Sequence, residues 1–95
     1  MIVSTTQKFK SEIKNGVYVF HSPGCFTCEE HIKNMEEHIT HFNLIEVDDI
    51  DFYESIGIKL TPCTIVFKKD VELFRKQGAF FNKQISELRE YIKGD

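Results

Sequence analysis

The chain has 95 residues, a net charge of −3 at pH 7 and the mixed composition of a globular protein, which together predict one domain over residues 1–95. No basic cluster points to nucleic acid, and no apolar run is long enough to cross a membrane or to serve as a leader peptide. The three cysteines, an odd number, argue against a secreted disulfide framework, so a cytoplasmic protein is expected.

The apolar pattern changes its period several times along the chain, which predicts helices that alternate with strands. A first helix is expected to begin at Thr5 or Thr6 and to place Phe9 and Ile13 on its buried face. The continuous apolar run at residues 17–20 is typical of a central strand that is covered on both faces. Later strands are predicted at residues 43–47, 63–67 and 71–74, and later helices at residues 48–57 and 81–92.

The long helix after the first strand has one apolar stripe, formed by Cys28, Ile32, Met35 and Ile39, and His31 is expected at its border. Because this helix joins the first two strands, those strands are expected to be parallel, whereas the last two strands form a hairpin. The sequence therefore predicts an α/β fold with a four-stranded mixed sheet flanked by helices on both faces, plus an extra N-terminal helix.

The most informative motif is a pair of thiols, Cys25 and Cys28, at the start of this long helix. Two thiols at this spacing can close into a disulfide and reopen, which is the chemistry of thiol–disulfide exchange. Unpaired backbone N–H groups and the helix dipole favour an anion at Cys25, so its thiol pKa is predicted to be lowered and Cys25 to be the nucleophile. Cys28 lies on the apolar stripe and is predicted to be the inward-facing resolving thiol.

A metal site is the main alternative for this pair, because zinc commonly takes four cysteine or histidine ligands. Only Cys63, His31 or a more distant histidine is available to complete such a set, so no metal is predicted. An iron–sulfur cluster shared between two chains is a further alternative. Cys63 itself is predicted to be a small buried strand residue near Cys25, with a regulatory thiol as its second interpretation.

Three other residues near the thiols each have two interpretations. His21 is the histidine nearest to Cys25 in sequence, and it either stabilises the thiolate or is a solvent-facing loop residue. Phe26 is either an exposed contact for substrates or a cover for the helix start. Pro62 at the start of a strand marks an edge or a special bend. A cis Thr61–Pro62 peptide would turn the Thr61 backbone towards an extended substrate, whereas trans, the commoner isomer, would merely start the strand.

Together these motifs resemble the thioredoxin-like family of thiol–disulfide oxidoreductases over residues 1–95. The resemblance rests on the two-cysteine motif after an apolar strand, on Thr61-Pro62 before another strand, and on Gly78 before the last helix. It implies a thioredoxin fold in which the proline is cis and faces the catalytic dithiol across a shallow groove. The substrate groove that the resemblance implies is formed by Phe26, Thr61, Pro62 and Gly78.

The resemblance also implies an activity and its partners. The chain is expected to reduce protein disulfides through a mixed disulfide, to act as a monomer, and to need no cofactor beyond its Cys25–Cys28 dithiol. Its electrons are expected to come from a flavoprotein thioredoxin reductase fed by NADPH. A glutathione-dependent, glutaredoxin-like enzyme is one alternative, although Gly78-Ala79 stands where that class usually has a Gly-Gly pair. A non-catalytic binding module of the same fold is another.

The chain departs from the thioredoxin pattern at the site itself. The pair between the cysteines and the residue before them differ from the usual Gly-Pro and Trp. Val19 stands where thioredoxins bury the Asp that accepts the proton of the second thiol. His21, Glu29 or water are the candidates for that proton, and the sequence leaves the reduction potential open.

Overall fold

The structure is a computed structural model, and it describes residues 1–80 and 82–93. Within these residues the chain forms five strands and four helices. The strands are β1 (Ile2–Ser4), β2 (Gly16–His21), β3 (Asn43–Glu46), β4 (Cys63–Lys68) and β5 (Val71–Gln77). The helices are α1 (Thr6–Ser11), α2 (Phe26–His38), α3 (Ile50–Ser55) and α4 (Asn82–Lys93).

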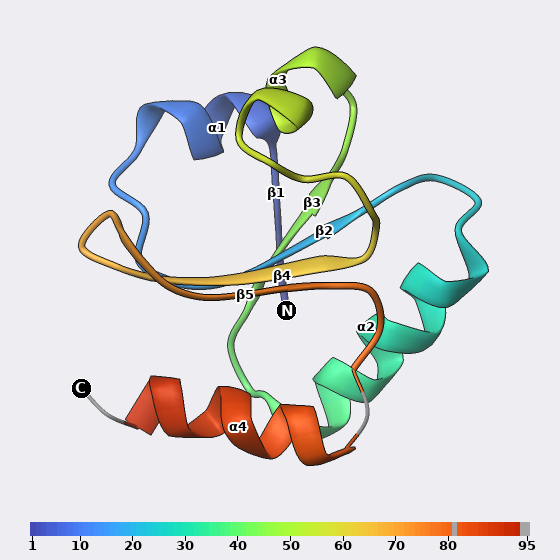
Figure 1. Cartoon of the computed structure of the whole chain (residues 1–95), viewed down its shortest axis with the longest axis vertical. Coiled ribbons are helices and arrows are strands. Elements are labelled where there is room, and N and C mark those ends of the chain that lie inside the picture. The colour runs from blue at the N-terminus through green and yellow to red at the C-terminus, as the bar shows by residue number, and fades with distance from the viewer. Residues whose placement is uncertain (81, 94–95) are drawn as a thin grey trace.

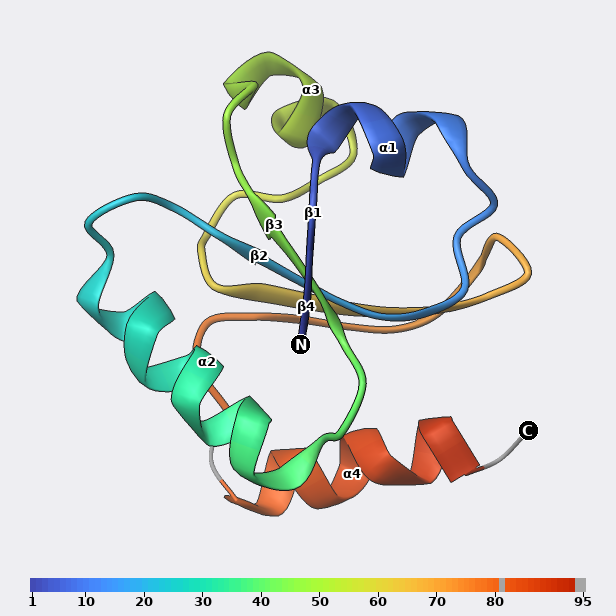
Figure 2. The ribbon, with the colours of Figure 1, turned by 180° about the vertical axis from the view of Figure 1, so that it is seen from behind.

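The strands form one mixed sheet in the order β1-β3-β2-β4-β5. β1, β3 and β2 run parallel, as predicted for the two strands that the long helix joins, and β4 runs antiparallel to both β2 and β5. Helices α1 and α3 cover one face of the sheet and α2 and α4 cover the other, as Figures 1 and 2 show from opposite sides. β2 therefore lies at the centre, and residues 17–20 are buried, as predicted.

The prediction of four strands is wrong by one, because the structure adds β1 at the sheet edge beside β3. β1 shows no alternation of buried and exposed side chains, because Ile2 is 53% exposed and Val3 is 75% exposed. Backbone bonds hold it instead: its residues pair with β3, and the Ile2 N–H donates to the Phe42 carbonyl at 2.9 Å. A short edge strand held by main-chain bonds leaves little trace in a side-chain pattern.

The first helix forms where the sequence predicts it, but it is shorter. Thr5 caps α1, and its Oγ1 accepts the Lys8 N–H at 3.1 Å. Phe9 is 2% exposed, as predicted. The helix ends at Ser11, however, and Ile13 beyond it is 71% exposed. The prediction that Ile13 shares the buried face is therefore wrong, because the chain has already left helical geometry at that point.

The two faces of the sheet are packed with different side chains. Between the sheet and helices α1 and α3 lies a mainly aromatic cluster, which we call the aromatic face and which contains Phe9, Tyr18, Phe20 and Tyr53. The Phe9 ring meets Tyr18 and Phe20 edge-on, with centroids 5.4 and 5.2 Å apart, which is a favourable arrangement of rings. The cluster between the sheet and helices α2 and α4, which we call the aliphatic face, includes Val17, Val19, Met35, Ile39, Leu44, Val66, Ile85 and Leu88.

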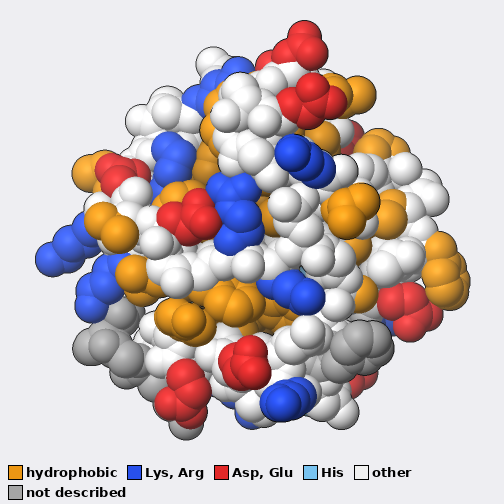
Figure 3. Space-filling model, in the orientation of Figure 1, with side chains coloured by type: hydrophobic (Ala, Val, Ile, Leu, Met, Phe, Trp, Pro, Cys, Tyr) orange, Lys and Arg blue, Asp and Glu red, His pale blue; other side chains and the backbone are white. Residues whose placement is uncertain are grey.

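Helix α4 closes the aliphatic face. Ile85 and Leu88 are buried, as predicted, whereas Ile92 is 37% exposed, and the predicted contribution of Phe81 lies outside the described residues. Figure 3 shows hydrophobic side chains gathered at the surface along the seam between β5 and α4. Among the helices in residues 1–80 and 82–93, none has the length and hydrophobicity that a membrane crossing needs.

Candidate thiol–disulfide site

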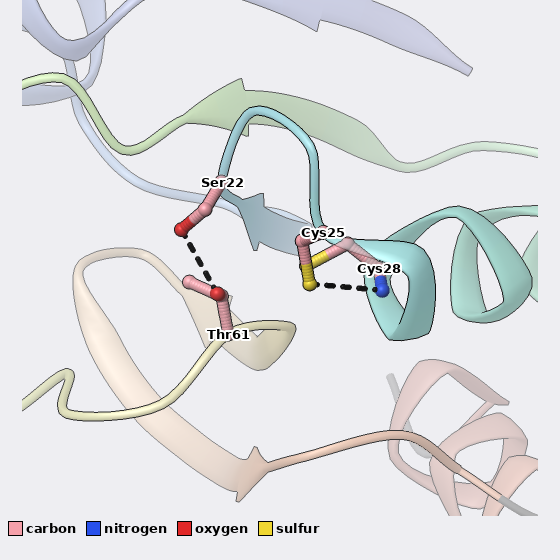
Figure 4. The surroundings of a disulfide bond; sticks show 4 residues. All are labelled: Ser22, Cys25, Cys28 and Thr61. Atoms are coloured by element: carbon pink, nitrogen blue, oxygen red, sulfur yellow. Dashed lines mark hydrogen bonds between the residues drawn. A yellow bond between two sulfur atoms is a disulfide. The ribbon is translucent and has the colours of Figure 1, made fainter.

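Cys25 and Cys28 lie at the N-terminal end of α2, joined as a disulfide with their Cα atoms 5.2 Å apart. Cys25 is the N-cap of the helix, and its Sγ accepts the Cys28 N–H at 3.2 Å. Cys28 is 1% exposed and faces inward, as predicted, whereas Cys25 is partly exposed. Figure 4 shows the pair where the loop from β2 enters the helix. The two cysteines are therefore unequally exposed.

The loop from β2 to α2 brings Cys25 to the surface. Gly24, the last residue before it, has a φ of +70°, a left-handed backbone conformation that glycine adopts without strain. Cys25 then precedes the first helical turn, where backbone N–H groups lack helical partners and the helix dipole is positive. An anion at the Cys25 Sγ is stabilised there, which suits a thiolate once the disulfide is reduced.

The loop before β4 faces the loop that carries the dithiol. The Thr61–Pro62 peptide is cis, as the resemblance implies. Thr61 Oγ1 and Ser22 Oγ lie 2.9 Å apart, and Figure 4 shows the two side chains pointing towards one another. The Pro62 carbonyl accepts the Gly78 N–H at 2.7 Å. The structure therefore ties Gly78, Pro62 and Thr61 in series to the loop that leads to Cys25.

The fold of the chain matches solved thioredoxin structures, although no protein-family model and no curated protein sequence matches the chain. The thioredoxin of Trypanosoma brucei brucei superposes with a TM-score of 0.74 at 22% identity, over 96% of this chain and 91% of that chain. The Plasmodium falciparum thioredoxin gives 0.71 at 22% identity, over 99% and 98%. The Fasciola hepatica thioredoxin gives 0.69 at 23% identity, over 98% and 97%. The chain has the thioredoxin fold.

Within this thioredoxin fold, an apolar side chain fills the position where the resemblance expects a proton-accepting Asp. Val19 is 0% exposed at the centre of β2 and packs in the aliphatic face. It pairs with Thr64 of β4 in the sheet register. Glu29, one of the candidate proton acceptors, is exposed on the first turn of α2. The structure thus puts no carboxylate at the Val19 position.

Two predicted neighbours of the dithiol lie at the surface to different degrees. Phe26 is 73% exposed, and its role as a substrate contact stays a prediction. His21 ends β2 and is partly exposed, and its carbonyl accepts the Val47 N–H at 2.7 Å. Among the described residues no hydrogen bond joins the His21 imidazole to either cysteine, so its role as a modulator stays a prediction.

The third cysteine is a buried strand residue, as predicted. Cys63 is 0% exposed, packs in the aromatic face and pairs with Phe20 in the sheet register. Burial raises the pKa of its thiol to about 11, so the thiol is protonated at neutral pH. A regulatory role would need an accessible thiolate, which this environment disfavours. In residues 1–80 and 82–93 no three His, Cys, Asp or Glu side chains are placed to hold a metal ion.

The sequence prediction misplaced one residue near the site, His31. Its side chain is 1% exposed and does not lie at the border of the apolar stripe. Its Nε2 lies 2.9 Å from Thr64 Oγ1, and its Nδ1 accepts the Phe80 N–H at 3.3 Å. A histidine with partners for both ring nitrogens can be buried at little cost. Burial lowers the pKa of the imidazole to about 4. The sequence did carry a signal, since His31 follows Cys28 by three residues on the same helix.

Proposed function

We propose that the chain is a thiol–disulfide oxidoreductase that reduces protein disulfides through Cys25 and Cys28. The observation that supports this most strongly is the unequal pair at the start of α2. Cys25 is a partly exposed N-cap, and Cys28 is 1% exposed and bonded to it. A partner can reach the first sulfur, and the second sulfur can reach the first, which is what a two-step exchange needs.

The reaction starts from the reduced chain. The Cys25 thiolate attacks one sulfur of the substrate disulfide, so that a mixed disulfide forms and the other substrate sulfur leaves as a thiolate. Cys28 then loses its proton and attacks the Cys25 Sγ. The Cys25–Cys28 disulfide forms, and the second substrate sulfur leaves as a thiolate. The substrate gains two electrons, and the dithiol loses two.

We place the substrate against Phe26, Thr61, Pro62 and Gly78. The exposed Phe26 ring offers an apolar contact beside the attacking thiol. Gly78 has a φ of +99° and no atom within 4 Å of where a Cβ would stand, so it leaves space open beside Pro62, to which it is hydrogen-bonded. An extended substrate segment could therefore approach the backbone on this side of the dithiol without meeting a side chain at Gly78.

The oxidised chain must be reduced again by a second partner. We propose a thioredoxin reductase-like flavoprotein that takes electrons from NADPH, so that the chain works with its own dithiol as its only redox group. In this proposal the chain acts as a monomer in the cytoplasm. Glutathione as the electron donor and a purely binding role are the alternatives that the assays below separate.

Insulin reduction in the presence of NADPH and thioredoxin reductase tests the proposal directly. The native chain is expected to accelerate the reaction, and Cys25→Ser is expected to lose the activity because the nucleophile is gone. Cys28→Ser is expected to stop after the first step and to accumulate a mixed disulfide with the substrate, which intact-mass measurement detects. Cys63→Ala is the matched control, and it should keep the activity because this buried thiol takes no part in the exchange.

Two other outcomes would point elsewhere. Turnover of a glutathione mixed disulfide with glutathione reductase, in place of insulin reduction, would indicate the glutaredoxin-like enzyme. If neither reaction occurs and Cys25→Ser still binds the partners of the native chain, the chain is a binding module and the oxidoreductase proposal is overturned.

A further inference from the structure

One buried imidazole, that of His31, contacts two segments besides its own helix. Its Nε2 lies 2.9 Å from Thr64 Oγ1 on β4, and its Nδ1 accepts the Phe80 N–H at 3.3 Å in the loop between β5 and α4. The three residues are 1%, 0% and 4% exposed, in that order. A broken bond would leave a buried polar group without its partner, so the bonds favour one arrangement of α2, β4 and the loop.

The three contact points lie close in sequence to the three parts of the proposed substrate site. On α2 the resolving thiol precedes His31 by three residues. Just before β4 the cis proline precedes Thr64 by two residues, and in the loop after β5 Gly78 precedes Phe80 by two. A shift of either segment relative to α2 would therefore move part of the groove relative to the dithiol.

The partners of the imidazole determine which nitrogen carries its proton. A backbone N–H can only donate, so Nδ1 of His31 presents its lone pair to Phe80. Nε2 then carries the proton and donates to Thr64 Oγ1. Only the neutral ring can make both bonds, because an imidazolium has no lone pair to offer. Burial lowers the pKa of the ring to about 4 and thereby keeps it neutral at pH 7.

We propose that His31 is a positioning residue for protein disulfides, which through Thr64 and Phe80 holds the substrate groove in place relative to the dithiol. The inference rests on the proposed function and adds how its groove is held. A small disulfide can meet Cys25 without using the groove, whereas a protein disulfide needs both. Loss of the His31 contacts should therefore weaken the binding of a protein disulfide and leave exchange with a small disulfide unchanged.

Four substitutions separate the two hydrogen bonds. His31→Asn keeps an acceptor near Nδ1 for the Phe80 N–H and loses the bond to Thr64. His31→Gln keeps a donor near Nε2 for Thr64 and loses the bond to Phe80. His31→Leu loses both bonds and keeps an apolar volume, and Thr64→Val removes the hydroxyl with little change of shape. Leu88→Ala is the matched control, because Leu88 is 0% exposed in the same aliphatic face but lies on α4, outside the groove segments.

The measurement is single-turnover oxidation of the pre-reduced chain, which needs no reductase, at a temperature where circular dichroism shows each variant folded. For insulin, His31→Leu should raise the half-saturating concentration about tenfold, and each variant that loses one bond should raise it about threefold, in line with the net contribution of a hydrogen bond. The rate constant with hydroxyethyl disulfide should stay within about twofold of the native chain. Leu88→Ala should lower the unfolding midpoint and change neither reaction.

The Phe80 amide gives a reading that does not depend on activity. Its exchange with deuterium, followed by NMR, should stay slow in His31→Asn and become fast in His31→Gln and His31→Leu, because only Asn keeps an acceptor for it. Equal protection in all three variants would show that the bond does not hold the loop, and the proposal would fail.

The kinetic measurements also test the positioning role of His31. A folded His31→Leu variant with unchanged half-saturation by insulin overturns the positioning role, and so does an equal loss with insulin and with the small disulfide. If His31→Leu does not fold, the Asn, Gln and Thr64→Val variants give the same comparison. A native chain that does not react with insulin overturns the proposed function and the His31 role with it. A native chain that reacts and is matched by its variants overturns the His31 role alone.

Discussion

Among the described residues, each face of the sheet buries one threonine hydroxyl, and the surroundings of the two differ. On the aromatic face Thr6 Oγ1 donates to Asp48 at 2.6 Å and therefore accepts from the Tyr53 hydroxyl, also at 2.6 Å. On the aliphatic face Thr64 Oγ1 accepts from His31 Nε2 at 2.9 Å. Asp48 is exposed and lines a surface hollow, so water can reach the first cluster. The second cluster is more deeply buried, since His31, Thr64 and Phe80 are 1%, 0% and 4% exposed, although a surface hollow also reaches His31 and Phe80.

The difference separates two uses of a buried polar group. The cluster around Thr6 ties α1 to α3 and to the segment that leads into it. The cluster around Thr64 ties together the segments on which the proposed groove depends. We therefore expect a change on the aromatic face to affect stability alone, and a change beside His31 to affect both stability and the use of a protein substrate.

The largest expected effect is on the aromatic face. Phe9→Ala would remove a 2% exposed ring that contacts several others, and such a cavity costs about 3–5 kcal/mol of unfolding free energy. Denaturant titration would measure the loss. The rate constant for insulin, per folded molecule, should not change, because the cavity lies across the sheet from α2. A fall in that rate constant would break the division between the faces.

The second expected effect is a loss of unfolding free energy as the pH falls. The His31 imidazole has a folded-state pKa of about 4 and an unfolded value near 6.5, so between these pH values the unfolded chain binds a proton that the folded chain does not. Its contribution to stability is complete at pH 7 and is lost as the pH falls towards 4, by about 3 kcal/mol in total. His31→Leu should lack this part of the pH dependence in urea titrations, whereas Thr6→Val should retain it. Equal slopes for His31→Leu and the native chain would contradict the buried neutral ring.

The smallest expected effect concerns the two buried threonines. Thr6→Val and Thr64→Val remove the same hydroxyl from opposite faces, and each should cost about 1–2 kcal/mol of unfolding free energy. Thr6→Val is expected to cost less, because water can stand in for the lost partner. Only Thr64→Val should raise the half-saturating concentration of insulin. If both variants raise it, or neither does, the threonines are equivalent and the comparison fails.

Most of the fold can be predicted from the pattern of apolar and polar side chains along the sequence. The apolar run at residues 17–20 and the helical stripe with Cys28 and Met35 predicted the central strand and the long helix correctly. Strand β1 was not predictable in this way, because its stability comes from backbone pairing and its side chains are exposed. Ile13 was misplaced for the opposite reason, since an apolar residue in the right period does not extend a helix that has already ended.

At the site, sequence spacing predicted the inward orientation of Cys28, and the resemblance predicted the cis form of Pro62. The sequence placed His31 at the border of the apolar stripe because the helical period puts it beside that stripe. Its burial depends on Thr64 and Phe80, which lie 33 and 49 residues away in the chain. Such partners come together only through the tertiary fold, so a helical period alone could not reveal them.

In the oxidised chain, alkylation of the buried third cysteine can be used to measure unfolding. With Cys25 and Cys28 joined, Cys63 is the free thiol, and it lies in β4 between two neighbouring strands. Its raised pKa and complete burial protect it from iodoacetamide in the folded state. Unfolding returns it to water and to a pKa near 8.5, where alkylation becomes fast. The rate at which the chain gains one carbamidomethyl mass under native conditions therefore measures how often this part of the fold opens, and the same measurement applies to every variant above that keeps all three cysteines.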